Sequence, residues 1–183
     1  MSFPGIPSLD AAVMAFIQTH FHNTVTDTVF PIITSLGEAG IGWIVLSLVL
    51  LCFKKTRRTG GLVLIAMTVT LLFGELTLKN IICRLRPCNV FTNFPMLIAR
   101  PTSYSFPSGH TSSSFAAALI LTLRHKKVGW LAYIPAVLIA FSRLYLYVHF
   151  PSDVLGGAVL GVGIGLLMLY GERRIAGRCK HRP

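Results

Sequence analysis

Residues 60–82 read GGLVLIAMTVTLLFGELTLKNII, an apolar run that carries a glutamate and a lysine near its end. A helix needs about 20 apolar residues to cross a hydrocarbon core of about 30 Å. Charged side chains are costly in lipid and usually face a protein-lined polar site. The run therefore predicts a transmembrane helix with a functional site near Glu75 and Lys79.

The composition of the whole chain supports a membrane protein. Of its 183 residues, 53% are hydrophobic and only 13% are charged, which is unusual for soluble globular domains. Further apolar segments of about spanning length lie at about 32–53, 108–123, 128–148 and 153–171. We predict one all-α domain over residues 1–183, a polytopic transmembrane helix bundle with five clear spans.

An additional helix is predicted at residues 8–22, where apolar side chains recur with helical spacing opposite a polar face. This segment is short for a bilayer span. Two interpretations fit it: an amphipathic helix lying on the outer membrane surface, or a sixth helix that enters the bilayer. We favour the surface helix.

The distribution of cations predicts the orientation. Twelve of the 17 Lys and Arg residues lie in the clusters 54–58 and 124–127 and in the basic tail 172–183. Alternating spans place these clusters on one face, which the positive-inside rule makes cytoplasmic. The clusters are short and separated by apolar runs, so the net charge of +11 does not predict nucleic-acid binding.

Five cations fall at or near the opposite, extracytoplasmic face, where topology gives no reason for them: Lys79, Arg84, Arg86, Arg100 and Arg143. Such cations suit an anionic ligand. For Arg84 and Arg100, pairing with lipid head groups is an equally good explanation.

The four cysteines do not have metal-ligand spacing, and neither a metal nor another cofactor is predicted. Cys52 and Cys179 are expected to be free thiols. A disulfide between Cys83 and Cys88 stays open, because five residues around an Arg-Pro turn suit its geometry poorly.

Three short polar segments meet at the extracytoplasmic face if the spans alternate. They are KNIICRLRP at 79–87, FPSGH at 106–110 and SRLYLYVHFPSD at 142–153. Together they offer what phosphoryl transfer requires, namely donors for the equatorial oxygens, a nucleophile and an acid for the leaving oxygen.

The cations and one helix start are the predicted phosphate ligands. Arg86 and Arg143 can each bind phosphate oxygens with two donors, whereas Lys79 is a compact point charge. Ser108 and Gly109 begin a helix, where backbone N–H groups can face an anion. An ion pair of Arg143 with Glu38 or Glu75 is the alternative for that guanidinium.

Two histidines and one aspartate are the predicted catalytic residues. His149 and Asp153 are spaced so that the carboxylate can accept a hydrogen bond from one ring nitrogen, which leaves the other nitrogen nucleophilic. His110 is then the general acid, and afterwards the base that activates water. Supporting positions around them are assigned to Glu75, Pro87 and Ser142.

These residues match the signature K-x6-RP, PSGH, SR-x5-H-x3-D, so the chain resembles the phosphatidic acid phosphatase type 2 superfamily of lipid phosphate phosphatases. The matching positions are Lys79, Arg86, Pro87, Pro107, Ser108, Gly109, His110, Ser142, Arg143, His149 and Asp153. The resemblance implies a metal-independent hydrolase that forms a phosphohistidine on His149. It also implies a helical core like that of vanadium haloperoxidases.

The small size is similar to that of compact bacterial members such as phosphatidylglycerophosphate phosphatase B. The resemblance implies a multi-pass protein of the plasma membrane that converts phosphatidylglycerol phosphate to phosphatidylglycerol. We expect the lipid to enter sideways between helices, for instance between the second and fourth spans, with its tails in the bilayer. An undecaprenyl pyrophosphate phosphatase is one alternative, and an anion or lipid transporter is another. A lipid phosphate and the surrounding membrane lipids are the expected partners; neither nucleic acid nor an obligate protein partner is expected.

Overall fold

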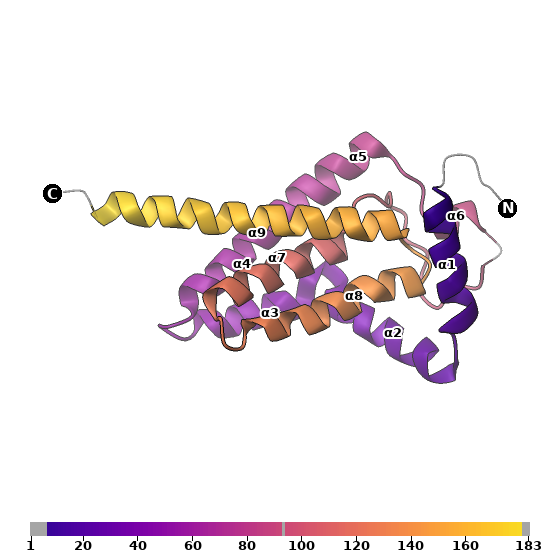
Figure 1. Cartoon of the computed structure of the whole chain (residues 1–183), viewed down its shortest axis with the longest axis horizontal. Coiled ribbons are helices and arrows are strands. Elements are labelled where there is room, and N and C mark those ends of the chain that lie inside the picture. Colours follow the sequence, from indigo (N-terminus) through magenta and orange to yellow (C-terminus); the bar gives the residue numbers. More distant parts are fainter. Residues whose placement is uncertain (1–6, 93, 181–183) are drawn as a thin grey trace.

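A computed structural model describes residues 7–92 and 94–180, with side chains except at 176–180. These residues form helices and connecting segments, without a strand in the described ranges. In chain order the helices are α1 (Ser8–His20), α2 (Thr24–Gly37), η1 (Glu38–Gly40), α3 (Ile41–Leu51), α4 (Arg57–Thr70), η2 (Leu71–Leu78), α5 (Lys79–Ile82), α6 (Pro87–Val90), α7 (Gly109–Arg124), η3 (Gly129–Ala132), α8 (Tyr133–Tyr145) and α9 (Pro151–Lys180). The predicted all-α bundle is confirmed (Figure 1).

Three helical stretches of the described chain are long and apolar enough to cross a bilayer, within Thr24–Leu51, Arg57–Val90 and Pro151–Ile175. A shorter apolar stretch covers Gly129–Tyr145, and α7 has 16 residues. The predicted number of five spans stays a prediction, because α7 and α8 are short for a bilayer by length alone.

The first long helix is broken, where a continuous span over about 32–53 was expected. It begins at Thr24 and is interrupted at η1, where Ala39 and Gly40 have φ values of 49° and 70°. Left-handed residues redirect a helical chain. A side chain at position 40 would also collide with Met67, whose terminal carbon lies 2.2 Å from the place of a Cβ. The break leaves Glu38 exposed at the edge of a cavity in the bundle.

The second long helix changes its winding in the middle. It is α-helical from Arg57, π-helical from Leu71 to Leu78, and α-helical again to Ile82, so its end agrees with the predicted 60–82. Wider π turns occur often at functional sites. This one includes Glu75 and ends beside Lys79.

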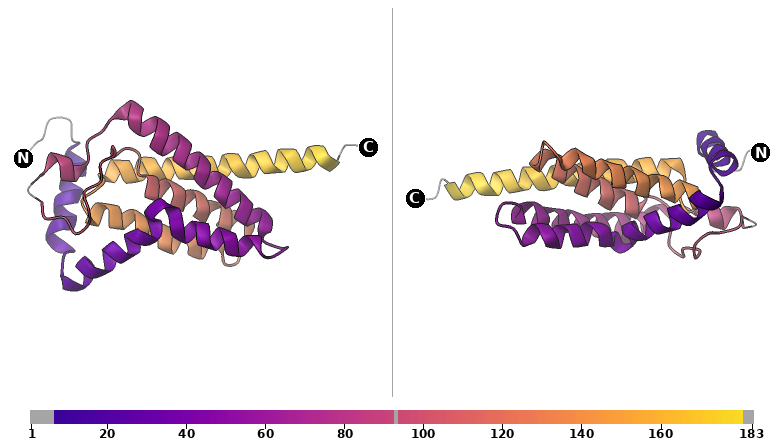
Figure 2. Two further views of the ribbon diagram at one scale, coloured as in Figure 1. Left: turned by 180° about the vertical axis from the view of Figure 1, so that it is seen from behind. Right: turned by 90° about the horizontal axis from the view of Figure 1, so that it is seen from below.

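Helix α7 lies in the centre of the bundle, between α4, α8 and α9 (Figure 2). Its residues Ala116, Ala117, Ala118 and Ile120 have no solvent exposure. Small side chains let the neighbouring helices come close to its axis, as is usual for membrane helices.

Helix α9 touches α7 through a row of glycines. A Cβ at Gly157 would lie 2.5 Å from the Ser108 carbonyl oxygen, and one at Gly161 would lie 2.2 Å from that of Ser112. This row, which Gly165 continues, therefore packs inside the chain. The contact aligns the starts of α7 and α9.

Helix α1 lies across one end of the bundle (Figure 1). It turns Asp10, Met14 and Ile17 inward, whereas Leu9 and Phe16 are exposed. This arrangement agrees with the favoured amphipathic helix. The position of α1 relative to a bilayer stays a prediction.

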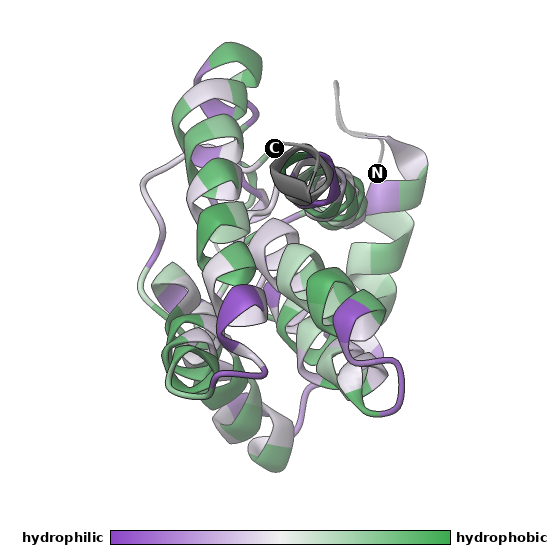
Figure 3. Cartoon of the chain, turned by 90° about the vertical axis from the view of Figure 1, so that its left-hand side faces the viewer, coloured by the Kyte–Doolittle hydropathy of each residue, from purple (hydrophilic) through white to green (hydrophobic). Residues whose placement is uncertain are grey.

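The opposite end carries the basic clusters. Hydrophilic turns between α3 and α4 and between α7 and α8 lie at the end to which α9 runs (Figure 3). Arg124 pairs there with Glu172. The predicted tail 172–183 begins inside α9, which continues as helix to Lys180; residues 181–183 lie outside the described chain.

The close contact between α9 and α7 yields a stability prediction. Gly161→Ala places a methyl group against the Ser112 carbonyl, and such overpacking costs about 1–3 kcal/mol. We expect a lower midpoint of thermal unfolding in detergent. Gly163→Ala is the matched control, because its Cβ would meet open space. Equal midpoints for the two variants would contradict the packing argument.

Candidate active site

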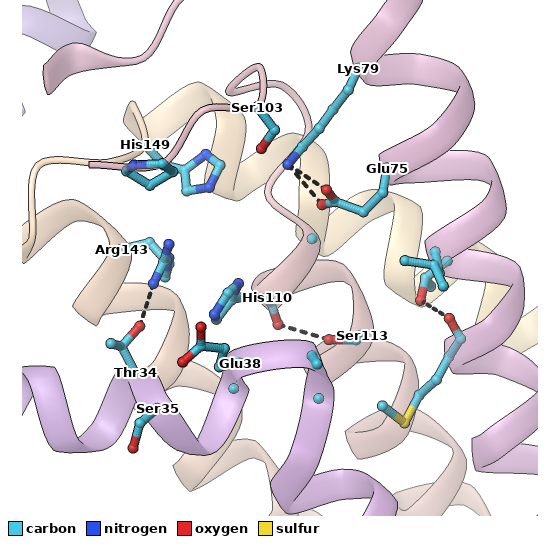
Figure 4. Close-up of a pocket in the computed structure, with 18 of the residues that line it drawn as sticks. Thr34, Ser35, Glu38, Glu75, Lys79, Ser103, His110, Ser113, Arg143 and His149 are labelled. Carbon is cyan, nitrogen blue, oxygen red and sulfur yellow. Dashed lines mark hydrogen bonds and ion pairs between the residues drawn. The ribbon is translucent and has the colours of Figure 1, made fainter. Parts of the chain in front are cut away.

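A cavity of about 810 Å³ opens at the end of the bundle where the three signature segments meet (Figure 4). Seven of the eleven predicted site residues line it: Glu75, Lys79, Arg86, Gly109, His110, Arg143 and His149. The structure therefore brings the predicted cations and both histidines around one space. Helices η2, α5, α7 and α8 supply five of them, whereas Arg86 precedes α6 and His149 lies between α8 and α9.

The other predicted residues lie behind the cavity wall. Asp153 and Ser108 are completely buried, and the Ser108 N–H donates to the Asp153 carbonyl oxygen at 3.1 Å. That amide is engaged, so the expectation that Ser108 offers its N–H to an anion does not fit this structure. Pro87 begins α6, and the Ser142 hydroxyl donates to its own helix at Ile139.

Arg86 joins three parts of the site. Its Nε donates to the Ser103 carbonyl at 2.7 Å, and Nη2 donates to the Ser103 hydroxyl at 2.9 Å. Its Nη1 lies 2.9 Å from the Val148 carbonyl and 3.0 Å from His149 Nε2. The guanidinium is only 3% exposed. Arg86 thus fixes the loop after α6 and faces the predicted nucleophile.

The contact with Arg86 decides the tautomer of His149. A guanidinium can only donate, so Nε2 must accept, and its lone pair faces Arg86 on the cavity wall. The proton of the neutral ring is then on Nδ1. Burial lowers the pKa of His149 well below its usual range, and the nearby Arg86 and Arg143 lower this pKa further. The imidazole is therefore neutral at pH 7.

Asp153 lies on the Nδ1 side of His149, but more loosely than predicted. Its Oδ2 is 3.6 Å from Nδ1, which is longer than a hydrogen bond. The same oxygen accepts the Phe150 N–H at 2.8 Å, and Oδ1 accepts from Arg84 at 2.5 Å. The orientation is as expected, whereas the direct hydrogen bond is absent because the carboxylate is held by these other donors.

Lys79 and Glu75 form the ion pair that their spacing predicts. Lys79 Nζ lies 2.8 Å from the Glu75 carboxylate, one turn earlier. This carboxylate also occupies the space beside Gly109, since a Cβ there would be 2.0 Å from Glu75 Oε1. An acidic group therefore covers two predicted phosphate ligands.

Arg143 is 4% exposed and donates to the Thr34 hydroxyl. Among the ion pairs of the described residues it has neither Glu38 nor Glu75 as partner, so the alternative pairing is not found. Its Nε is buried without a hydrogen-bond partner. A buried unsatisfied guanidinium N–H is expensive, which favours an anion as its ligand.

His110 points into the cavity from the first turn of α7 and lies against the break in the first long helix. A Cβ on Gly37 would be 2.8 Å from the His110 ring. The next residue, Glu38, directs its carboxylate into the same space (Figure 4). The break thus sets an acidic residue beside the predicted general acid.

Arg84 and Arg100, the two cations that lipid head groups could also explain, both bind protein groups. Arg100 donates to the carbonyls of Cys88 and Thr92 at 2.5 and 2.9 Å, which closes the loop after α6. Arg84 pairs with Asp10 and Asp153. Both cations therefore have protein partners in this structure, and the pairing with lipid head groups stays a prediction.

Cys52, Cys83 and Cys88 are free thiols, and the open possibility of a disulfide between the last two is not realised. The side chain of Cys179 lies outside the described residues. Within the described chain, three or more His, Cys, Asp or Glu side chains do not come together as a metal site would require.

Sequence reasoning missed three groups that shape the cavity. Ser103 holds Arg86, and Thr34 holds Arg143, but neither residue stands in a recognisable pattern. Glu38 was considered only as an ion-pair partner. The neighbouring Gly37 and Gly40 were the available signal, because glycines in an apolar run can mark a break.

Known proteins and protein families match the part of the chain that carries these residues. A model of the PAP2 superfamily matches residues 59–175. An undecaprenyl-diphosphatase of Sulfolobus acidocaldarius is 39% identical over 131 residues, which cover 71% of this chain and 63% of that protein. The aligned part is thus slightly less than two thirds of this relative.

Solved structures agree with the fold. The crystal structure of a transmembrane PAP2-type phosphatidylglycerolphosphate phosphatase from Bacillus subtilis superposes with a TM-score of 0.75 at 29% identity, covering 94% of this chain and 89% of that one. A bacterial vanadium-dependent iodoperoxidase gives a TM-score of 0.72 at 15% identity, covering 93% and 51%. The latter confirms the expected haloperoxidase-like core as a fold. The apolar helices and these relatives make the chain a membrane protein.

The fork of Arg86 yields a prediction about the site. Arg86→Lys keeps the charge but cannot reach Ser103, Val148 and His149 together. Each lost charged hydrogen bond is worth about 1.5–3 kcal/mol, so we expect kcat/KM for phosphate release to fall about 10-fold to 100-fold. Arg57→Lys, on the exposed opposite end, is the control. A loss of less than twofold for Arg86→Lys would contradict the assigned geometry.

Proposed function

The chain belongs to the PAP2 superfamily, and from this premise we propose that it is a membrane lipid phosphatase acting through a phosphohistidine on His149. The observation that carries the proposal is the Nε2 lone pair of a buried neutral imidazole, which accepts from Arg86 at 3.0 Å on the wall of a cationic cavity. Phosphate monoester hydrolysis needs this combination of nucleophile and cations.

The substrate phosphate binds among Lys79, Arg86 and Arg143. Arg143 gains a partner for its unsatisfied Nε, and Arg86 exchanges the His149 lone pair for a phosphate oxygen. The Glu75 carboxylate leaves the space over Gly109, so that the first N–H groups of α7 can face the anion. Substrate binding thereby frees the nucleophile.

In the first chemical step, His149 Nε2 forms a bond to phosphorus, and the bond from phosphorus to the lipid oxygen breaks. His110 donates its proton to that leaving oxygen. The imidazolium that develops on His149 is stabilised by Asp153, 3.6 Å from Nδ1. Lys79, Arg86 and Arg143 compensate the charge on the phosphoryl oxygens.

In the second step, a water molecule attacks phosphorus and gives a proton to His110, and the bond between nitrogen and phosphorus breaks. Inorganic phosphate leaves, and both histidines return to their starting protonation. Asp153 holds the ring orientation in both steps.

Two lipid substrates fit the site. Phosphatidylglycerol phosphate, giving phosphatidylglycerol, is favoured by the structural similarity to the Bacillus phosphatase across nearly the whole chain. Undecaprenyl diphosphate is favoured by the 39% identity to the Sulfolobus diphosphatase, and its leaving group would be the lipid monophosphate. Both substrates place a terminal phosphate on His149. A transporter would have no use for a nucleophile with a second histidine.

The cavity suggests how a lipid reaches the site. Below the charged end, its wall consists of apolar or weakly polar residues from α3, α4 and η2, including Ile44, Leu64, Met67 and Leu71. We infer that the acyl or prenyl chain lies between the first and second long helices. This differs from the gap between the second and fourth spans that the sequence suggested, because α8 contributes only Arg143 to the wall.

The proposed orientation puts the cavity at the extracytoplasmic face of the plasma membrane. Its support is charge: the basic turns at 54–58 and 124–127 lie at the opposite end of the bundle, and cytoplasmic ends attract Lys and Arg. A multi-pass arrangement follows if α7 and α8 cross together with the longer helices.

Phosphate release tests the proposal directly. Purified protein in detergent with a metal chelator should release inorganic phosphate from phosphatidylglycerol phosphate or undecaprenyl diphosphate. His149→Ala should reduce release to background, and His110→Ala should lower it by a factor of about 10²–10⁴. A wild-type protein without any release from either lipid, or an active His149→Ala variant, would refute the function or the nucleophile. Rates on the two lipids decide the substrate.

The apolar arm of the cavity gives a separate prediction. Leu64→Trp fills the space between α3 and α4, so KM for a long-chain lipid phosphate should rise, by about 10-fold if about two methylenes lose contact at about 0.8 kcal/mol each. Hydrolysis of a short-chain, water-soluble phosphate should stay unchanged. Ile65→Trp is the matched control, because Ile65 is 56% exposed and lies outside the wall. Equal effects of the two variants would place the lipid elsewhere.

A further inference from the structure

A second polar cluster lies behind the cavity, where α1 meets the start of α9. Arg84 is at its centre. Its Nη1 lies 2.5 Å from Asp153 Oδ1 and 2.6 Å from the Ser152 hydroxyl. Its Nη2 lies 2.7 Å from Asp10 Oδ2. The guanidinium also stacks over the Phe150 ring, 4.4 Å from the ring centre.

Asp10 is buried although it belongs to a helix on the outside of the bundle. It is 3% exposed. Its Oδ1 accepts the Ser152 N–H at 2.9 Å, and its Oδ2 accepts the Ser152 hydroxyl at 2.5 Å. Ser152 is in the first turn of α9, where an anionic acceptor is stabilised by the helix dipole. Asp10 therefore caps α9, whose first turn contains the predicted catalytic residue Asp153.

The charges of the cluster explain why Asp10 matters. Arg84 alone beside Asp153 would cancel the carboxylate charge that the developing imidazolium of His149 needs. With Asp10 included, two carboxylates share one guanidinium, and the cluster keeps a net charge of −1. Arg84 holds the Asp153 carboxylate in place. Asp10 offsets the charge of Arg84, so that the His149 ring still experiences the negative charge of Asp153.

We propose that Asp10 and Arg84 are positioning residues for the reaction, which makes the N-terminal helix α1 part of the catalytic apparatus. They act through Asp153 on His149, without touching the substrate. The inference rests on the proposed phosphatase function. It goes further because it makes the turnover rate depend on how α1, a helix outside the signature segments, packs against the bundle.

The test compares variants that remove single charges in detergent-purified protein. Asp10→Asn should lower kcat about 10-fold with KM within a factor of two, because only the imidazolium step loses stabilisation. Arg84→Gln should lower kcat by a larger factor. The double variant should be no slower than Arg84→Gln alone, because the two residues act along one path.

Gln18→Ala is the matched control. Gln18 also holds α1 to the bundle, through the Leu144 and Tyr145 carbonyls at 3.3 and 3.2 Å, but it makes no contact with the Arg84 cluster. This variant should lower the thermal midpoint and leave kcat unchanged. If Gln18→Ala lowers kcat as much as Asp10→Asn, the effect is loss of helix docking, and the inference is wrong.

A measurement without substrate separates this inference from the function itself. A double-mutant cycle on the thermal midpoint with Asp10→Asn and Arg84→Gln should give a non-additive coupling, whatever the protein hydrolyses. Additive midpoints would overturn the inference, as would an unchanged kcat for Asp10→Asn. An inactive wild type with a coupled pair would instead refute the proposed phosphatase.

Discussion

The close contact between α9 and α7 is the constraint on which the site depends. Gly157 and Gly161 bring the α9 backbone against the carbonyls of Ser108 and Ser112. This contact sets the first turns of the two helices side by side, where the Ser108 N–H meets the Asp153 carbonyl. The predicted general acid and the aspartate behind the nucleophile thus have a fixed separation, determined by packing remote from the chemistry.

The cavity beside this contact contains more positive charge than its acidic side chains neutralise. Lys79, Arg86 and Arg143 are each at most 4% exposed in an otherwise apolar bundle. Glu75 pairs with the lysine, while Arg86 is held by carbonyl oxygens and Arg143 by one hydroxyl. Burying cations with neutral partners is expensive in free energy. The cavity therefore suits an anion, which would complete the hydrogen bonds of both guanidinium groups.

The surroundings of the nucleophile extend beyond the signature segments. Arg86 decides which nitrogen of His149 carries the lone pair, and Ser103 decides where Arg86 points. Behind the ring, Arg84 connects Asp153 to Asp10 on the N-terminal helix. Catalysis in such a site would depend on residues from nearly every part of the described chain, since each holds the orientation of the next.

The sequence alone determined the all-α class, the end of the second long helix at Ile82 and the cations and histidines that face the cavity. Apolar run length and the alternation of spans suffice for these, because both follow from the cost of exposing polar groups to lipid. Only the tertiary structure decided the break at Ala39 and Gly40, the π-helical turn before Lys79 and the partners of Arg84. Those features arise from contacts between residues far apart in the chain, and hydrophobic periodicity carries no information about such contacts.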